Sequence, residues 1–170
     1  MIITLSGLPG SGKSSVAKIL AQKLGYAFYS AGNEARKKAK ALGISPTEFL
    51  DDPTRVTSLD QGVSALSKKK NIVVDARLSA YLLPRADFRI FLYAPLTLRS
   101  VRIADRENIS FLTSFFRTWK RQRHEIVTYR RAYHVDFRNK KFYNIVFCTK
   151  GHTAKETADE LLWRINRGKK

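Results

Sequence analysis

Residues 7–14 read Gly-Leu-Pro-Gly-Ser-Gly-Lys-Ser, which fits the phosphate-binding pattern G-x-x-x-x-G-K-[ST]. Glycine lacks a Cβ, so the backbone at Gly7, Gly10 and Gly12 can take positive φ angles and turn its N–H groups toward a polyphosphate. We expect Lys13 to reach the β- and γ-phosphates of a nucleoside triphosphate, and the Ser14 hydroxyl to ligate Mg²⁺. These residue types therefore predict a nucleotide site.

The segments on both sides of this loop support the same prediction. Residues 1–5 form a short apolar, β-branched run that is typical of a buried strand. After Ser14 the apolar residues recur with a helical period, and Gly25 is placed to end that helix. Strand, glycine loop and helix is the arrangement that a P-loop requires, whereas a structural turn would need neither the lysine nor the hydroxyl.

A second candidate metal ligand follows another predicted strand. Residues 72–74 are continuously apolar and lead into Asp75. In a P-loop protein, a carboxylate at the tip of a neighbouring strand can hold Mg²⁺ directly or through water. Asp75 could also serve only as a helix cap or turn residue, but Arg77 close by favours a functional site.

The rest of the chain alternates strands with helices. Short apolar runs predict further strands at 26–29, 88–93 and 144–148, and capping signals at Ser45 and Thr153 predict helix starts. This alternation indicates an α/β fold with a five-stranded parallel sheet covered by helices on both faces. No repeat or linker divides residues 1–170, so we expect one domain, with excursions at 31–70 and 106–138 near the carboxyl ends of the strands.

The charge is strongly positive, with 32 Lys and Arg against 14 Asp and Glu, a net charge of +18. Such a surface favours polyanions: nucleotides, nucleic acid or an anionic surface. The basic helical pattern from 110 to 133 also carries aromatic residues, among them Phe111, Phe116 and Trp119, which we expect to pack rather than to stack on bases.

Several classes of protein are disfavoured. The one cysteine, Cys148, rules out an internal disulfide and suits a reducing compartment, and the three histidines lack metal-ligand spacing. No apolar run approaches a membrane span, and the N-terminal run is too short and uncharged for a signal peptide. We expect a cytoplasmic monomer or small oligomer without a membrane partner.

The chain resembles the nucleoside monophosphate (NMP) kinases, and most of all the archaeal-type cytidylate kinases, which are P-loop NTPases related to adenylate kinase. The resemblance covers nearly the whole length. It is carried by residues 7–15, by Ser30-Ala31-Gly32 with Arg36, by Asp75-Ala76-Arg77, by Ala94-Pro95 followed by Arg99, Arg102 and Arg106, and by Arg121. It implies a P-loop three-layer sandwich with a helical NMP-binding insertion at 31–70 and a helical lid at 106–138. It also implies that the γ-phosphoryl group of ATP is transferred to CMP or dCMP with Mg²⁺.

The resemblance further implies roles for individual residues. Arg36 and Arg77 would hold the α-phosphate of the acceptor, and Ser30 and Gly32 would shape its pocket. Arg102 is similar to the arginine that stacks on adenine, with residues 148–150 beside the adenine edge. The catalytic set would be Lys13, Arg106 and Arg121, the two arginines acting from the lid side. The ATP site would comprise Gly7, Gly10, Ser11, Gly12, Lys13, Ser14, Ser15 and Arg102, and the metal would be held by Ser14 and Asp75.

The identity of the acceptor base, and with it the function, has alternatives. Ala76 stands where the family usually has glycine, Thr128 replaces a basic residue of the lid, and only Asp60 matches a residue that could read a polar base edge. An adenylate-kinase-like enzyme with another NMP acceptor is one alternative. An RNA- or ribosome-associated P-loop ATPase that uses its basic surface is the other.

Overall fold

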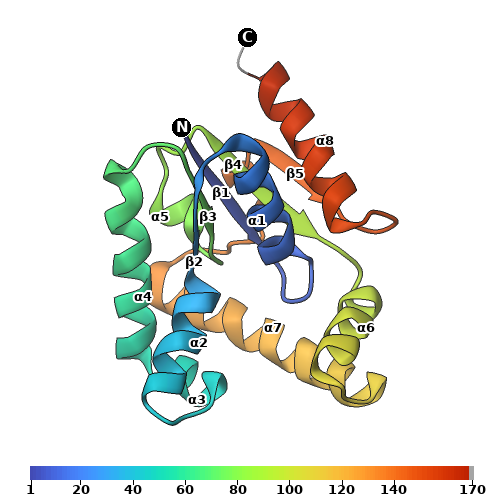
Figure 1. Cartoon of the computed structure of the whole chain (residues 1–170). Coiled ribbons are helices and arrows are strands. Elements are labelled where there is room, and N and C mark those ends of the chain that lie inside the picture. Colours follow the sequence, from blue (N-terminus) through green and yellow to red (C-terminus); the bar gives the residue numbers. More distant parts are fainter. Residues whose placement is uncertain (169–170) are drawn as a thin grey trace.

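The computed structural model describes residues 1–168 (Figure 1). Its strands are β1 (Ile2–Gly7), β2 (Ala27–Ser30), β3 (Ile72–Asp75), β4 (Phe88–Tyr93) and β5 (Ile145–Cys148). Its α-helices are α1 (Lys13–Leu24), α2 (Ala31–Ala41), α3 (Pro46–Asp51), α4 (Pro53–Ala65), α5 (Ser79–Leu82), α6 (Leu96–Glu107), α7 (Phe111–Tyr133) and α8 (Ala154–Arg167). Two 3₁₀ turns, η1 (Leu66–Lys68) and η2 (Lys140–Phe142), complete the chain.

The strands form one parallel sheet in the order β2-β3-β1-β4-β5, which confirms the predicted sheet. The chain crosses from β3 on one side of β1 to β4 on the other. In open parallel sheets, such a switch in strand order leaves a crevice for ligands outside the carboxyl ends of the strands. The register places Leu5, Ser30 and Asp75 side by side at that edge.

Helices cover both faces of the sheet, as expected of a three-layer sandwich (Figure 1). On one face, α1 and α8 pack onto the sheet through buried residues that include Leu20 and Leu161. On the other, Val63 of α4 packs with Ile72 and Val74 of β3. Because both faces are covered, most residues of the central strands are apolar on both sides of the sheet, as in residues 72–74 of β3.

The local sequence signals have the predicted structural effects. Gly25 ends α1 in the left-handed conformation, with φ of 65°, and its N–H bonds back to the carbonyls of Ala21 and Gln22. Ser45 and Thr153 each form a complete capping box, at the start of α3 and α8. The short helix α5 was not predicted, because it carries no capping or periodicity signal.

The helix α7 passes across the carboxyl edge of the sheet, from α6 on one side to α2–α4 on the other (Figure 1). Its inner face packs against the core: Ile126, Tyr129 and Tyr133 contact a buried cluster that includes Phe91 and Phe137. The expectation that all its aromatic residues pack is wrong. Phe111, Phe116 and Trp119 are 42%, 64% and 44% exposed, because nothing in residues 1–168 covers the outer face of the helix.

None of the helices within residues 1–168 has the length and apolar character needed to cross a membrane.

Candidate active site

The P-loop leaves β1 at Gly7 and enters α1 at Lys13. Its glycines take left-handed or strained angles, with φ of 147° at Gly7, 76° at Gly10 and 86° at Gly12. A Cβ at Gly7 would lie 2.0 Å from the carbonyl oxygen of Leu92, so a side chain there is sterically excluded. The buried Ser11 hydroxyl oxygen has no hydrogen-bond partner among the described residues. An unsatisfied buried polar atom inside this loop fits a site that takes a polar ligand.

The Lys13 side chain folds back along the loop. It is only 8% exposed, and its ammonium group donates to the carbonyl oxygen of Leu8, 3.1 Å away. Burial, followed by repulsion from Arg77, lowers the pKa of Lys13 to about 7, although Asp75 and Glu125 act in the opposite direction. A polyphosphate at this position would supply the negative charge that the buried lysine lacks.

Asp75 ends β3 and joins two hydroxyl groups. Ser14 and Ser30 both donate to its Oδ2 atom, at 2.5 and 3.0 Å. Ser30 also caps α2 by accepting from the N–H of Asn33. Carboxylate and hydroxyl oxygens are hard ligands of the kind that Mg²⁺ takes, and one or two carboxylates with substrate phosphates and waters usually hold it. Ser14 and Asp75 therefore fit the magnesium role.

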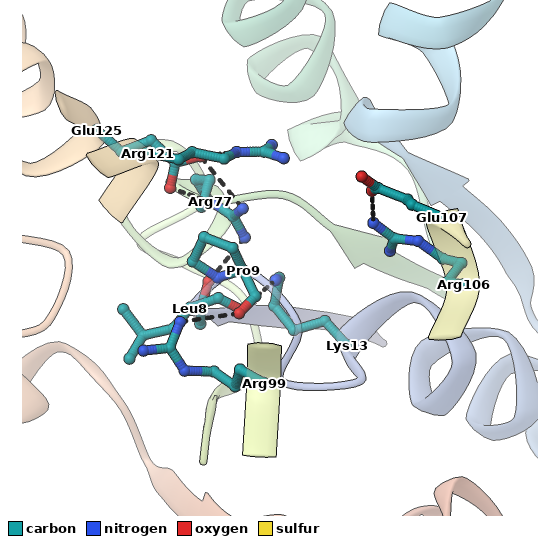
Figure 2. Close-up of polar contacts among 10 residues, drawn as sticks. Leu8, Pro9, Lys13, Arg77, Arg99, Arg106, Glu107, Arg121 and Glu125 are labelled. Atoms are coloured by element: carbon teal, nitrogen blue, oxygen red, sulfur yellow. Dashed lines mark hydrogen bonds and ion pairs between the residues drawn. The ribbon is translucent and has the colours of Figure 1, made fainter. Parts of the chain in front are cut away.

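An ion-pair cluster lies beside the P-loop (Figure 2). The Arg77 guanidinium donates to both oxygens of Glu125, with Nε 2.8 Å from Oε2, and its Nη1 donates to the carbonyl oxygen of Gly7 at 2.9 Å. Arg121, one turn before Glu125 on α7, donates from Nε to Oε1 at 2.9 Å. Lys13 and Arg77 thus donate to the consecutive carbonyls of Leu8 and Gly7, so the cation that begins α1 and the cation that follows β3 lie at the same corner of the site.

Arg99 holds the P-loop from the opposite side. It is 2% exposed and donates to the carbonyl oxygens of Ala94 and Pro9 and to the side chain of Gln122. Burial, followed by repulsion from Arg77, lowers its pKa to about 10. Through these three hydrogen bonds, Arg99 links α6, the P-loop and α7.

Arg102 lies on α6, and its guanidinium approaches Gly12 at the start of α1. Its guanidinium donates to the hydroxyl and the carbonyl oxygen of Thr149, and the Thr149 hydroxyl donates to the carbonyl of Ser11. This chain of hydrogen bonds joins residues 148–150, which the resemblance puts beside adenine, to the P-loop.

The structure brings most of the predicted site residues together. Gly7, Gly10, Ser11, Gly12, Lys13, Ser14, Arg77, Asp75, Ser30, Arg102 and Arg121 lie in or directly beside the P-loop, as the contacts above describe. Ser15 follows in the first turn of α1 and is exposed. Arg36 lies on α2, where it bonds to Asn33 and approaches Gly32.

Arg106 is the least constrained of the predicted residues. Its hydrogen bond goes to the neighbouring Glu107, and its side chain is 62% exposed. Figure 2 shows Arg106 and Arg121 projecting toward one another from α6 and α7. The two arginines therefore face the same space from opposite helices.

Sequence reasoning missed Glu125 and assigned no role to Arg99. The i, i+4 spacing of Arg121 and Glu125 on a helix could have indicated their pair. No local signal could have indicated the pair with Arg77, which lies 48 residues away. For Arg99, neither the spacing nor the residue type distinguishes a buried arginine from the exposed Arg106, about two turns further along the same helix.

Three comparisons bear on this site. The family model described as "AAA domain" matches residues 3–117. The cytidylate kinase of Methanocella arvoryzae is 38% identical over 100% of this chain and 99% of its own length, and that of Ignicoccus hospitalis is 35% identical over 87% and 89%. Among solved structures, shikimate kinase from Acinetobacter baumannii covers 99% of this chain and 94% of its own, with a TM-score of 0.70 and 19% identity. A gluconokinase from Sinorhizobium meliloti has a TM-score of 0.64 with 17% identity, over 97% and 91% of the two chains.

The solved structures share the fold with this chain, and the sequence relatives share most of its length. In this chain the Ser14–Asp75 pair and the ion-pair cluster of Arg77, Arg121 and Glu125 lie beside the P-loop. The chain therefore belongs to the cytidylate kinase family and is a P-loop kinase.

Proposed function

We propose that this kinase transfers the γ-phosphoryl group of ATP to CMP or dCMP, giving CDP or dCDP and ADP. The supporting observation is the position of Arg77 and Arg121 beside Lys13, joined by Glu125. A simple ATPase needs no second set of phosphate-binding cations next to the P-loop. A kinase needs one, because its acceptor is itself an anionic phosphate.

In this proposal the donor phosphates lie in the P-loop, where the backbone N–H groups and Lys13 bind them, and Arg102 lies beside adenine. Arg36 and Arg77 bind the acceptor phosphate, next to Ser30 and Gly32. The residues 31–70 form the acceptor-binding segment and 106–138 the lid. Lys13, Arg106 and Arg121 stabilise the negative charge that spreads over the equatorial oxygens of the transferring group.

The bond from the γ-phosphorus to its bridging oxygen breaks as a bond to an acceptor phosphate oxygen forms. No general base is required, because that oxygen is already ionised. Ser14 and Asp75 would hold Mg²⁺, which supplies charge neutralisation at the β- and γ-oxygens when bound. Closure of the helices over the substrates would exclude water and so suppress hydrolysis of ATP. We place the reaction in the cytoplasm.

Which base the acceptor carries has to be decided by experiment. Asp60, the residue expected to read a polar base edge, already accepts a hydrogen bond from the Tyr133 hydroxyl at 2.5 Å. The test is ADP formation from ATP and Mg²⁺ with CMP, dCMP, UMP, AMP or GMP, beside a control without acceptor. Fast turnover with CMP and dCMP alone supports the proposal. Equal turnover with AMP or UMP would favour another acceptor, and turnover independent of any acceptor would refute the kinase assignment.

RNA binding is a second candidate function, which the outer face of α7 supports. The helix carries six Lys and Arg against one Glu, and Leu112, Phe116 and Trp119 are exposed on it. Arg123 lies over the Trp119 ring at 5.0 Å. Exposed aromatic rings among several cations suit single-stranded RNA, whose bases stack on the rings while its phosphates bind the arginines. The same charges disfavour self-association of this face.

This candidate is tested with a labelled single-stranded RNA at several salt concentrations. Contact with Z phosphates should give a log–log slope of about −0.7Z. Trp119→Ser should weaken binding about tenfold or more. Trp163→Ser is the matched control, since Trp163 is also exposed and also lies under an arginine, but on α8. Absence of binding at about 100 mM salt would refute this function, and so would equal losses in the two variants.

A further inference from the structure

Glu125, the one acidic residue in α7, accepts hydrogen bonds from two arginines at the same time. Its side chain is only 14% exposed. Oε2 accepts from Nε of Arg77, and Oε1 accepts from Nε of Arg121, at 2.8 and 2.9 Å. We propose that Glu125 is a positioning residue that orients Arg77 toward the acceptor phosphate and Arg121 toward the transferring phosphoryl group. This inference rests on the proposed function.

The contacts with Glu125 leave N–H groups of both arginines available for phosphate oxygens. A guanidinium carries five N–H groups in a rigid plane. Arg77 uses Nε and Nη2 on Glu125 and Nη1 on the Gly7 carbonyl, so two N–H groups have no partner within residues 1–168. Arg121 uses only Nε, which leaves both of its terminal nitrogens without a partner in the same range. Glu125 thus occupies the side of each guanidinium and leaves terminal N–H groups for phosphate oxygens.

The same contacts fix α7 relative to the P-loop. Arg77 follows β3, bonds to Gly7 at the start of the loop and bonds to Glu125 on the helix. Arg121 is half exposed and has its described hydrogen bond to Glu125, so this carboxylate is what limits its rotamers. Ordering a long side chain before substrate binds removes an entropic cost from the binding step.

Charge supports the same role. Lys13, Arg77 and Arg121 repel one another in a poorly solvated space. Burial acts to raise the pKa of Glu125, but Arg77 and Arg121 hold it below its usual range, so the group stays ionised. Without that carboxylate, Arg77 would be a buried charge without an acidic partner, and the three cations would move apart.

Glu125→Gln is the decisive substitution. Glutamine keeps the size of the side chain but offers one acceptor oxygen in place of two, and its NH₂ group would face a guanidinium donor. Glu125→Asp keeps the charge and both acceptors at a shorter reach. Glu160→Gln is the matched control, because Glu160 forms the same i, i+4 pair with Arg164 on α8, away from the site.

We expect Glu125→Gln to raise the KM of the acceptor monophosphate and to lower kcat, each about tenfold or more, because both arginines lose their orientation. Glu125→Asp should recover part of both losses, and Glu160→Gln should match the wild type within about twofold. A purely structural role would lower the thermal midpoint while leaving KM and kcat of the folded enzyme unchanged. Values for Glu125→Gln equal to those of Glu160→Gln would therefore overturn the proposal.

A measurement on the ligand-free protein separates this inference from the proposed function. The Nε–H signals of Arg77 and Arg121 in ¹⁵N NMR spectra should be protected from solvent exchange in the wild type, and at least one should lose protection in Glu125→Gln. Rapid exchange of both signals in the wild type would overturn the positioning role, whatever the acceptor. A wild type that orders both arginines but phosphorylates no monophosphate would instead refute the proposed function.

Discussion

The ammonium group of Lys13 donates to the carbonyl oxygen of Leu8, 3.1 Å away, within the loop that is built to hold phosphates. This contact gives the buried lysine one neutral acceptor, while burial lowers its pKa to about 7. The ligand-free protein therefore holds Lys13 partly deprotonated at neutral pH. A bound triphosphate would restore the charged form.

We predict that ATP binding takes up a proton above pH 7. Because the phosphates raise the pKa of Lys13, the uptake should approach one proton per site near pH 8.5 and vanish near pH 6. Calorimetry of ATP binding in buffers with different ionisation enthalpies measures this number. A buffer-independent binding enthalpy at pH 8.5 would contradict the low pKa.

Replacement of Lys13 should separate activity from stability. Lys13→Met should cost several kcal/mol of transition-state stabilisation, so kcat/KM should fall at least about a thousandfold. The same variant should be more stable than the wild type, by up to about 5 kcal/mol, below pH 7. The folded pKa lies below the unfolded value, so the buried charge is fully present, and fully costly, below pH 7. The cost fades as pH rises toward 10.5.

Denaturant unfolding at pH 6 and pH 9.5 checks the sign. The advantage of Lys13→Met should shrink between the two pH values. Lys18→Met is the control, because Lys18 lies on the same helix but is exposed, and it should show little effect at either pH. Loss of stability in Lys13→Met at pH 6 would contradict this account.

The Ser14–Asp75 pair predicts a magnesium defect. Asp75→Asn removes the carboxylate that accepts from Ser14 and Ser30, so the Mg²⁺ concentration for half-maximal activity should rise about tenfold or more. Titration of activity with Mg²⁺ at saturating ATP measures it. Asp159→Asn, which removes a surface pair with Lys23, is the control. An unchanged Mg²⁺ dependence in Asp75→Asn would exclude this residue from the metal site.

Replacing different P-loop glycines by alanine should lower the free energy of unfolding by different amounts. A Cβ at Gly7 would overlap the Leu92 carbonyl, whereas a Cβ at Gly12 would meet only Arg102, at 3.9 Å. Gly7→Ala should therefore destabilise the fold by about 3 kcal/mol or more, and Gly12→Ala by the strain of its positive φ, about 1–2 kcal/mol. Thermal unfolding of the two variants compares these values. Equal losses would mean that β1 and β4 can separate without penalty.

Substitutions of Arg99 and Arg106 on α6 should affect stability differently, because Arg99 is buried and Arg106 is exposed. Arg99→Met leaves buried acceptors on Pro9 and Ala94 unpaired and should lower the stability by about 2–4 kcal/mol. Arg106→Ala should leave the thermal midpoint nearly unchanged, because its pair with Glu107 is exposed, and should lower kcat about a hundredfold. Normal kcat in Arg106→Ala would remove that residue from the catalytic set.

Local features of this chain follow from its sequence alone. The P-loop, the end of α1 at Gly25, the two capping boxes and the five short strands each depend on residues close together in the chain. Short-range sterics and hydrogen bonds decide such features, so residue type and spacing are sufficient. Lys13, Ser14 and Asp75 were identifiable for the same reason, since each ends or begins a predicted element.

Only the tertiary structure decided which charges meet. Arg99 and Arg106 share one helix, yet Arg99 is buried, with hydrogen bonds to Pro9 of the P-loop and Gln122 of α7, whereas the Arg106 side chain is 62% exposed. No local pattern pairs Glu125 with Arg77, which follows β3 and lies 48 residues away in the chain. The outer aromatic residues of α7 stayed exposed because no other described element packs on that face. Partners at long sequence separation depend on how whole elements pack, which no local pattern specifies.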